Sequence, residues 1–267
     1  MLGIAFRGLL FGLVVSLGGC NRSATAPLPQ TRSGVALGPR NEAVVLFTGD
    51  YEPGALDEER WRLRLIGGTA AIVEAPVRAG RFACRFTLEP DQERAELQPR
   101  IALQALGSER WYGFSIFVTA DWKPIDANEV VAQWKHTNDP GETEGSPPLA
   151  LRVDDEEWRI NCRWDSRRTS DKEDPEGKAE IVRLPYERGR WTDWVFRYRC
   201  SFGDDGLIEA WKDGELVTRR QGPNAYNDEQ GLYFKWGIYH TEGRRVLVND
   251  ELRIGDEHAT FADVTPR

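Results

Sequence analysis

Val195-Phe196-Arg197-Tyr198-Arg199-Cys200 and Leu-Ile-Glu-Ala-Trp-Lys-Asp-Gly-Glu-Leu-Val-Thr (residues 207–218) decide the fold class. In the first stretch Phe196, Tyr198 and Cys200 alternate with Val195, Arg197 and Arg199, and this period of two is typical of a β-strand. In the second stretch an Asp-Gly pair separates two strand-like runs, which is a strong local signal for a hairpin. Together they predict antiparallel β-structure.

The rest of the chain repeats this pattern. Further strand-like runs cover residues 81–88, 111–119, 159–164 and 231–239, and 26 Gly and 15 Pro are spread along the 267 residues. Residues 56–65 could form one short helix, and residues 138–148 have the composition of a loop. Residues 165–178 are charged without an apolar period, which predicts a solvated excursion or a long turn. Many short strands with few helices predict an all-β protein. We expect a β-sandwich jelly roll of the concanavalin-like kind, with one concave face that forms a substrate cleft.

The N-terminus has the features of an export signal. Residues 1–19 contain Arg7 and an apolar run from Leu9 to Leu17 that is too short to span a bilayer comfortably. The run ends in Leu17-Gly18-Gly19-Cys20, which resembles a bacterial lipobox; an ordinary cleaved signal with an accidental Cys is the alternative. Residues 20–42 are polar and predict a flexible tether. We therefore expect a lipid on Cys20, a folded domain over residues 43–267, and an exported lipoprotein held in the cell envelope, periplasmic or at the cell surface.

Composition restricts the partners. The net charge of −8 argues against a general nucleic-acid binder, which needs a basic face to neutralise phosphates. It does not exclude a local basic cleft for an acidic ligand, because the chain contains 35 Lys and Arg. We expect a monomer whose contact with a membrane is made through the lipid anchor alone.

Three cysteines remain beyond residue 20. Cys162 and Cys200 lie in two strand-like runs, so this pair is the better candidate for a disulfide in an oxidising compartment, and Cys84 is expected to be a buried free thiol. The sequence has no CxxC motif and no Cys/His cluster, which argues against a zinc site.

Three short segments place polar residues at every second position with apolar residues between them. They are residues 94–100 (RAELQPR), 130–135 (VVAQWK) and 233–239 (YFKWGIY). A solvated strand face is the usual fate of polar residues in such a pattern. These segments, however, carry Arg, Gln, Lys and Tyr in place of the Thr, Ser and Glu of an ordinary wet face, which favours a cationic, hydrogen-bonding floor for an anionic ligand.

The same segments carry a resemblance to a known family. The spacing Arg-Ala-Glu-Leu, Gln-Trp-Lys and Tyr-Phe-Lys-x-Gly-x-Tyr resembles the jelly-roll polysaccharide lyases, the broad group that holds heparin lyase I-like, glucuronan lyase and alginate lyase enzymes. Residues 111–115, 146–151 and 206–214 support it, so the resemblance covers roughly residues 45–255. The segment 233–239 is the most specific part.

The resemblance implies β-elimination at a uronic acid in an anionic polysaccharide. Arg94 and Gln133 would neutralise the carboxylate beside the C5 proton, and Tyr239 would act as the acid and as a candidate base. Lys235 would assist the tyrosine or hold the substrate. The remaining candidates for substrate binding are Tyr233, Arg100 and His136.

One position departs from the family pattern. The group commonly has His two residues after the Gln, whereas this chain has Lys135 there, and strict alternation puts His136 on the opposite face unless a bulge re-aims it. Lys135 would then act as a base or as a further cation for the carboxylate. If it did neither, the protein would be a non-catalytic, lectin-like carbohydrate-binding jelly roll. A glycoside hydrolase is disfavoured because Glu96 is the only carboxylate in the proposed floor.

The resemblance implies no required cofactor, although related jelly rolls often hold a structural calcium ion. Glu52, near the first strand, and Asp250, near the last, could form such a site if the terminal strands pair.

Overall fold

The computed structural model describes residues 44–125, 129–239 and 242–267. The expected signal sequence, the lipidation site Cys20 and the tether lie outside these residues. Within them, no helix has the length and apolar character needed to cross a membrane.

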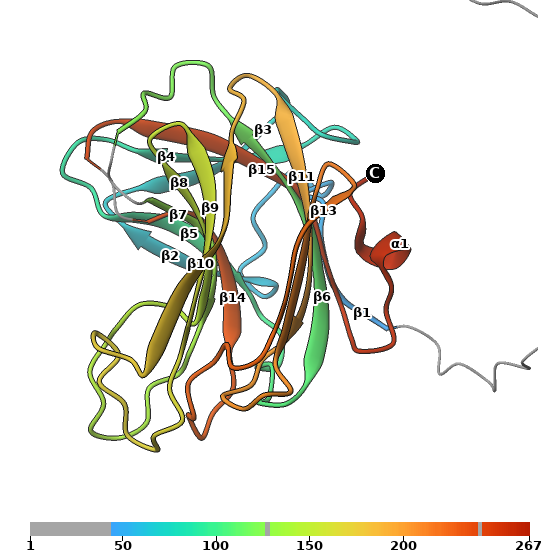
Figure 1. The fold of residues 1–267 in the computed structure, drawn as a ribbon. Helices are drawn as coiled ribbons and strands as arrows, with labels where there is room; N and C mark the ends of the chain where they lie inside the picture. The colour runs from blue at the N-terminus through green and yellow to red at the C-terminus, as the bar shows by residue number, and fades with distance from the viewer. Residues whose placement is uncertain (1–43, 126–128, 240–241) are drawn as a thin grey trace, which may run out of the picture. The chain divides into compact units, whose positions relative to one another are not determined.

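The described chain forms two antiparallel sheets stacked as two layers, as expected for a jelly-roll sandwich (Figure 1). One sheet has eight strands, in the order β13 (Glu215–Gln221), β12 (Leu207–Lys212), β11 (Trp191–Arg199), β6 (Glu109–Val118), β15 (Arg245–Gly255), β4 (Ala83–Leu88) and β3 (Thr69–Val73), with β1 (Val45–Gly49) also paired to β15. The other has seven, in the order β10 (Gly177–Pro185), β9 (Glu157–Trp164), β8 (Leu149–Asp154), β7 (Glu129–Lys135), β14 (Tyr233–Tyr239), β5 (Arg94–Pro99) and β2 (Trp61–Ile66).

The predicted hairpin is confirmed. Strands β12 and β13 pair directly, with Lys212 opposite Glu215, around a turn in which Asp213 has φ 51° and Gly214 has φ 87°. Positive φ at both central residues belongs to a type I′ turn, whose twist matches that of the flanking strands. The Asp-Gly pair therefore sets the register of this edge of the sheet.

The core lies between the two sheets. Trp134 of β7 and Trp236 of β14 are fully buried there and pack with Phe114 and Phe196 of the opposite layer. Because side chains alternate along a strand, the neighbours of Trp134 and Trp236 point away from the core. The outer face of the seven-stranded sheet is thus left for other functions. The short helix α1 (Phe261–Val264) instead packs against the eight-stranded sheet, near Trp111 and Val195.

The predicted Cys162–Cys200 disulfide is wrong. All three described cysteines are buried free thiols, as predicted for Cys84 alone. Cys162 belongs to the seven-stranded sheet, whereas Cys200 follows β11 of the other sheet and its thiol donates to the carbonyl of Ala105 at 3.2 Å. Stacked sheets lie about 10 Å apart, beyond the Cα separation of about 7 Å that a disulfide tolerates.

The carboxylates proposed for calcium are engaged elsewhere. The terminal strands β1 and β15 do pair, yet Glu52 accepts hydrogen bonds from the backbone N–H groups of Arg81 and Phe82. Asp250 accepts from the backbone of Arg78 at 2.8 Å. Both carboxylates therefore cap backbone donors.

A different group of carboxylates lies close together in the described residues, namely Asp139, Glu142 and Asp228. The ammonium of Lys172 lies among them, 2.5 Å from Glu142 and 2.7 Å from Asp228. The group thus has a positive charge supplied by the chain itself.

The expected helix over residues 56–65 is also wrong, because β2 begins at Trp61 and pairs with β5.

Candidate active site

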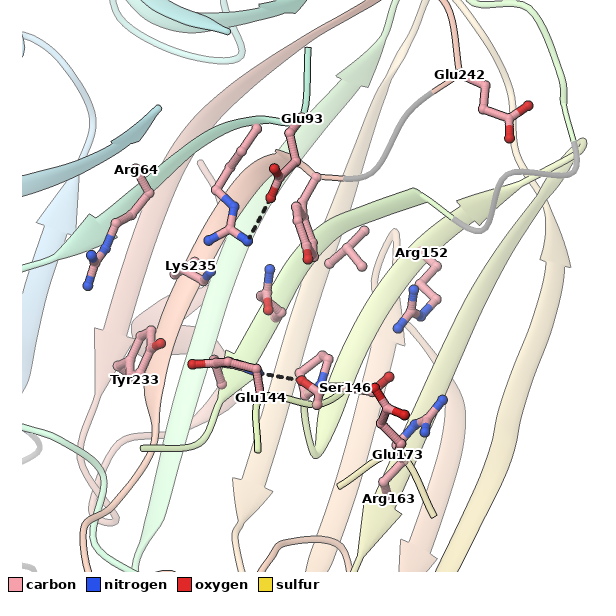
Figure 2. A pocket seen from close by; sticks show the side chains of 17 residues that line it. Arg64, Glu93, Glu144, Ser146, Arg152, Arg163, Glu173, Tyr233, Lys235 and Glu242 are labelled. Carbon is pink, nitrogen blue, oxygen red and sulfur yellow. Dashed lines mark hydrogen bonds and ion pairs between the residues drawn. The ribbon is translucent and has the colours of Figure 1, made fainter. Parts of the chain in front are cut away.

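A cleft of about 1010 Å³ opens on the outer face of the seven-stranded sheet (Figure 2). Strands β2, β5, β14, β7, β8 and β9 contribute to it, together with the loop 144–147. Six basic side chains line it: Arg64, Arg94, Lys135, Arg152, Arg163 and Lys235. Four acidic side chains line it: Glu93, Glu144, Glu173 and Glu242. The lining is thus more basic than acidic, in a protein whose net charge is −8.

The three polar segments meet in this cleft. Strand β14 lies between β5 and β7, with Tyr239 opposite Arg94, Lys235 opposite Gln133, and Tyr233 opposite Lys135. All six residues line the cleft. The apolar residues between them face the core, as the alternation predicted.

A buried carboxylate organises the floor from below. Glu96 is fully buried and accepts a hydrogen bond of 2.6 Å from the side chain of Gln133. Its other oxygen lies 2.9 Å from the Lys235 ammonium and 3.5 Å from the Arg94 guanidinium. One anion therefore orients the three groups that would contact a ligand, and it offsets part of their positive charge.

Tyr239 lies among cations. The Arg94 guanidinium lies 4.1 Å from the centre of its ring, and the Lys235 ammonium lies 5.8 Å from it. Gly237 enables this packing, because its φ is 136° and a Cβ there would come within 2.1 Å of the carbonyl oxygen of Ala95. The pairing of β14 with β7 also shifts register between Trp236 and Tyr239. Gly237 and the register shift therefore place Tyr239 at the end of the cleft floor.

Lys135 occupies the position two residues after Gln133. Its ammonium lies 3.1 Å from the carboxylate of Glu144 and donates to the carbonyl of Gly145. Burial lowers the pKa of Lys135, and the charge of Glu144 opposes this shift. The lysine therefore ties the loop 144–147 to the floor of the cleft.

His136 does not reach the cleft, so its predicted contact with substrate is wrong. It is 2% exposed and packs edge-on against Tyr226, with the ring centres 4.9 Å apart. Burial, followed by the charge of Lys135, lowers the pKa of His136 to about 2. No bulge re-aims it, so strict alternation holds.

Arg100 is also outside the cleft lining, which corrects a second prediction. Its Nε donates to the carbonyls of Glu58 and Trp61, at 2.7 and 3.2 Å. It follows β5, and its side chain fastens the turn that precedes β2. The predicted substrate contact is replaced by a structural one.

Several lining residues were missed from the sequence. Arg152 and Arg163 lie on the neighbouring strands β8 and β9, where the same alternation could have identified them. Arg64 of β2 donates to the side chain of Gln98, at 3.0 and 3.1 Å. The loop 144–147 had no signal beyond its composition.

Comparison with known families decides between the lyase and its rivals. The family model described as polysaccharide lyase matches residues 48–263. This chain belongs to the polysaccharide lyase family. A search of curated proteins finds no match for this lyase.

Solved structures share its fold. The endo-β-1,4-glucuronan lyase from the fungus Trichoderma reesei is 21% identical with a TM-score of 0.69, covering 84% of this lyase and 99% of that chain. A family 7 alginate lyase in complex with substrate is 13% identical with a TM-score of 0.55, covering 79% and 99%. The catalytic domain of a glycoside hydrolase family 131 protein from Coprinopsis cinerea is 12% identical with a TM-score of 0.54, covering 81% and 96%. Since a hydrolase shares the sandwich, the chemistry has to be argued from the cleft.

Proposed function

We propose that this lyase cleaves a uronic-acid-containing polysaccharide by β-elimination in the basic cleft. The observation that carries the proposal is the convergence of Arg94, Gln133 and Tyr239 over the buried carboxylate of Glu96. It joins a carboxylate-binding pair and a proton-transferring phenol on one strand-built floor.

The first requirement of the reaction is to neutralise the uronate. The C5 proton lies next to a carboxylate, and its removal places further negative charge on that group. The Arg94 guanidinium and the Gln133 amide would donate hydrogen bonds that strengthen as this charge develops. Their attachment to Glu96 holds them in place before the substrate arrives, which reduces reorganisation during the reaction.

The second requirement is proton transfer. A base takes the C5 proton, the C5–H electron pair forms the C4=C5 double bond, and the C4–O4 bond breaks as O4 receives a proton. Tyr239 can serve both steps, as a phenolate base and then as the acid, if the proton and the leaving group lie on one side of the sugar. The cations Arg94 and Lys235 lie beside its ring, 4.1 and 5.8 Å from the ring centre.

Lys135 then takes the role of a cationic clamp. Its ammonium already has two acceptors, Glu144 and Gly145, and the charge of Glu144 opposes the lowering of its pKa by burial. A lysine in this state would bind a carboxylate and position the loop beside it, and it would leave the proton chemistry to Tyr239.

A screen of uronate polysaccharides identifies the polymer. The structural likeness to a glucuronan lyase makes glucuronan the first to test, with alginate next. The reaction needs no cofactor in this scheme.

The decisive experiment compares wild type with Tyr239→Phe on each polymer. Product formation is followed by the ultraviolet absorbance of the new double bond conjugated to the carboxylate. We expect Tyr239→Phe to lose turnover and to keep substrate binding nearly intact, because the substitution removes one hydroxyl. Cleavage at the wild-type rate by Tyr239→Phe would refute the mechanism. A wild type that binds a polyuronate and cleaves none would refute the proposal in favour of the carbohydrate-binding alternative.

We also infer that the lyase is an exported lipoprotein anchored through Cys20 in the cell envelope. The Leu17-Gly18-Gly19-Cys20 sequence supports this, and so does an anionic polysaccharide as substrate, since such polymers are met outside the cytoplasm.

A further inference from the structure

A second group of cations lies in the cleft at a distance from Tyr239. Arg152 of β8 and Arg163 of β9 line the main cleft and also an adjoining hollow of about 410 Å³ over β8, β9 and β10. Figure 2 shows both side chains on the side of the cleft away from Arg64 and Tyr233. The two hollows therefore share a wall made of these two arginines.

The sheet places this pair at a defined spacing from the proposed chemistry. Tyr239 of β14 is opposite Val130 of β7, and Val130 is opposite Arg152 of β8. Two strand spacings separate Tyr239 from Arg152 along this row, or about 10 Å. A carboxylate bound at Arg152 would therefore belong to a different sugar from the one held by Arg94 and Gln133.

Arg152 and Arg163 place two positive charges along one wall of the cleft. Arg152 is only 7% exposed, and burial, followed by the charge of Arg163, lowers the pKa of Arg152 to about 10, whereas the charges of Asp154 and Tyr239 oppose this shift. Two like charges that line one cavity repel each other. A carboxylate between them would relieve this repulsion and could accept paired hydrogen bonds from a guanidinium.

The neighbouring arginine shows how the same sheet neutralises a cation when no ligand is involved. Arg159 of β9 has three acidic partners, Asp154 at 2.6 Å, Glu157 at 3.2 Å and Glu180 at 3.9 Å. Within the part of the chain that the structure describes, the Arg163 guanidinium has no ion pair of this kind. Arg163 is thus positioned to receive its anion from a ligand.

We propose that Arg152 and Arg163 form a second carboxylate subsite, which binds a uronate other than the one being cleaved. The proposal rests on the proposed function of the cleft. It makes the lyase sensitive to the length of its substrate, because an oligosaccharide gains this contact only when it extends from the reacting sugar across β7 to β8.

The test measures binding in a Tyr239→Phe background, so that the ligand is not consumed. Oligoglucuronates and alginate oligosaccharides of increasing length are titrated by calorimetry into this parent and into the parent with Arg163→Ala. We expect the parent to bind more tightly once the chain reaches the pair, and Arg163→Ala to lose about tenfold to a hundredfold in affinity for those longer chains. Arg163→Lys should recover part of the loss, because it keeps the charge without the planar fork.

Arg219→Ala is the matched control. It removes the same charge from β13 of the other sheet, where the side chain is 67% exposed. If Arg163→Ala binds every chain length as Arg219→Ala does, or if affinity in the parent does not depend on length, the subsite is refuted and the proposed function stands. If the parent binds no polyuronate of any length, the proposed function and the subsite both fail. Arg152→Lys repeats the test on the buried partner. Carboxyl-reduced oligosaccharides lack the carboxylates that the subsite would bind, so they should bind the parent and Arg163→Ala equally.

Discussion

The most informative single change is Glu96→Gln, which removes the buried charge below the floor and keeps the shape of the side chain. In the wild type this carboxylate balances Lys235, which is 3% exposed and 2.9 Å away. Removing one partner of a buried ion pair leaves an uncompensated buried charge, at a cost of about 3–5 kcal/mol. For a domain of this size that corresponds to a fall of roughly 6–20 °C in Tm.

The loss should depend on pH in a way that identifies Lys235 as its source. Burial lowers the pKa of Lys235, and the charge of Glu96 is the largest effect that opposes this shift. Without Glu96 the pKa of Lys235 in the folded state falls further below the unfolded value of about 10.4. Between these two values the unfolded chain binds a proton that the folded chain does not, so stability rises with pH. The difference in free energy of unfolding between the wild type and Glu96→Gln, measured by urea unfolding, should therefore become smaller between pH 7 and pH 10.

Two further variants test the reasoning. Glu93→Gln removes the same charge from a side chain that is 49% exposed and 3.7 Å from Arg94, and we expect a loss of at most about 1 kcal/mol. The double change Glu96→Gln with Lys235→Met removes both buried charges and should recover much of the stability without restoring turnover. If Glu96→Gln is no less stable than Glu93→Gln, or if the double variant is no more stable than Glu96→Gln, the buried pair does not act as described.

Three further predictions concern other parts of the chain. If Lys135 is a clamp, Lys135→Arg keeps kcat within about tenfold of the wild-type value. Wild-type turnover should then fall as pH rises through the lowered pKa of Lys135. A loss of more than about a hundredfold in kcat for Lys135→Arg would instead make this lysine the base. His136 is neutral in the folded state, with a pKa of about 2, and takes up a proton on unfolding below pH 6.5. The free energy of unfolding of the wild type should therefore fall by about 2 kcal/mol between pH 7 and pH 5, and that of His136→Phe should not show this fall. Equal acid sensitivity of the two proteins in urea titrations would contradict this. Cys20→Ser should move the exported protein from the membrane to the soluble fraction, because the acyl chains supply the anchoring, and a variant that stays with the membrane would show that the lipobox assignment is wrong.

The features that depend on neighbours in the chain were predictable from sequence. Alternation along 94–100, 130–135 and 233–239 placed their polar side chains on one face, since the direction of a side chain in a strand follows from its position alone. The Asp-Gly turn identified the hairpin for the same reason. The helix predicted over residues 56–65 is wrong because a short apolar run fits both a helix and a strand, and pairing with β5 decides between them.

The features that join distant segments were not predictable. Residues 165–178 read as a solvated excursion, yet Lys172 from this stretch is fully buried between Glu142 and Asp228, with the ring of Tyr226 at 5.2 Å. Glu142 comes from the segment between β7 and β8, whereas Tyr226 and Asp228 come from the segment between β13 and β14. Local composition carries no information about their meeting with Lys172. The role of Glu96 was hidden similarly, because its three partners lie on three strands.

The place of strand β1 bears on how the lyase can be held while it works. β1 is the first described strand and pairs with β15, in the layer that does not contain the cleft (Figure 1). Anything fastened ahead of β1, whether an acyl chain, a bead or a fused protein, therefore joins the sandwich through its eight-stranded layer. The floor of the cleft belongs to the other sheet, with the whole aromatic core between it and the point of attachment. Immobilisation through the N-terminus is accordingly the orientation that we would choose for a reusable catalyst.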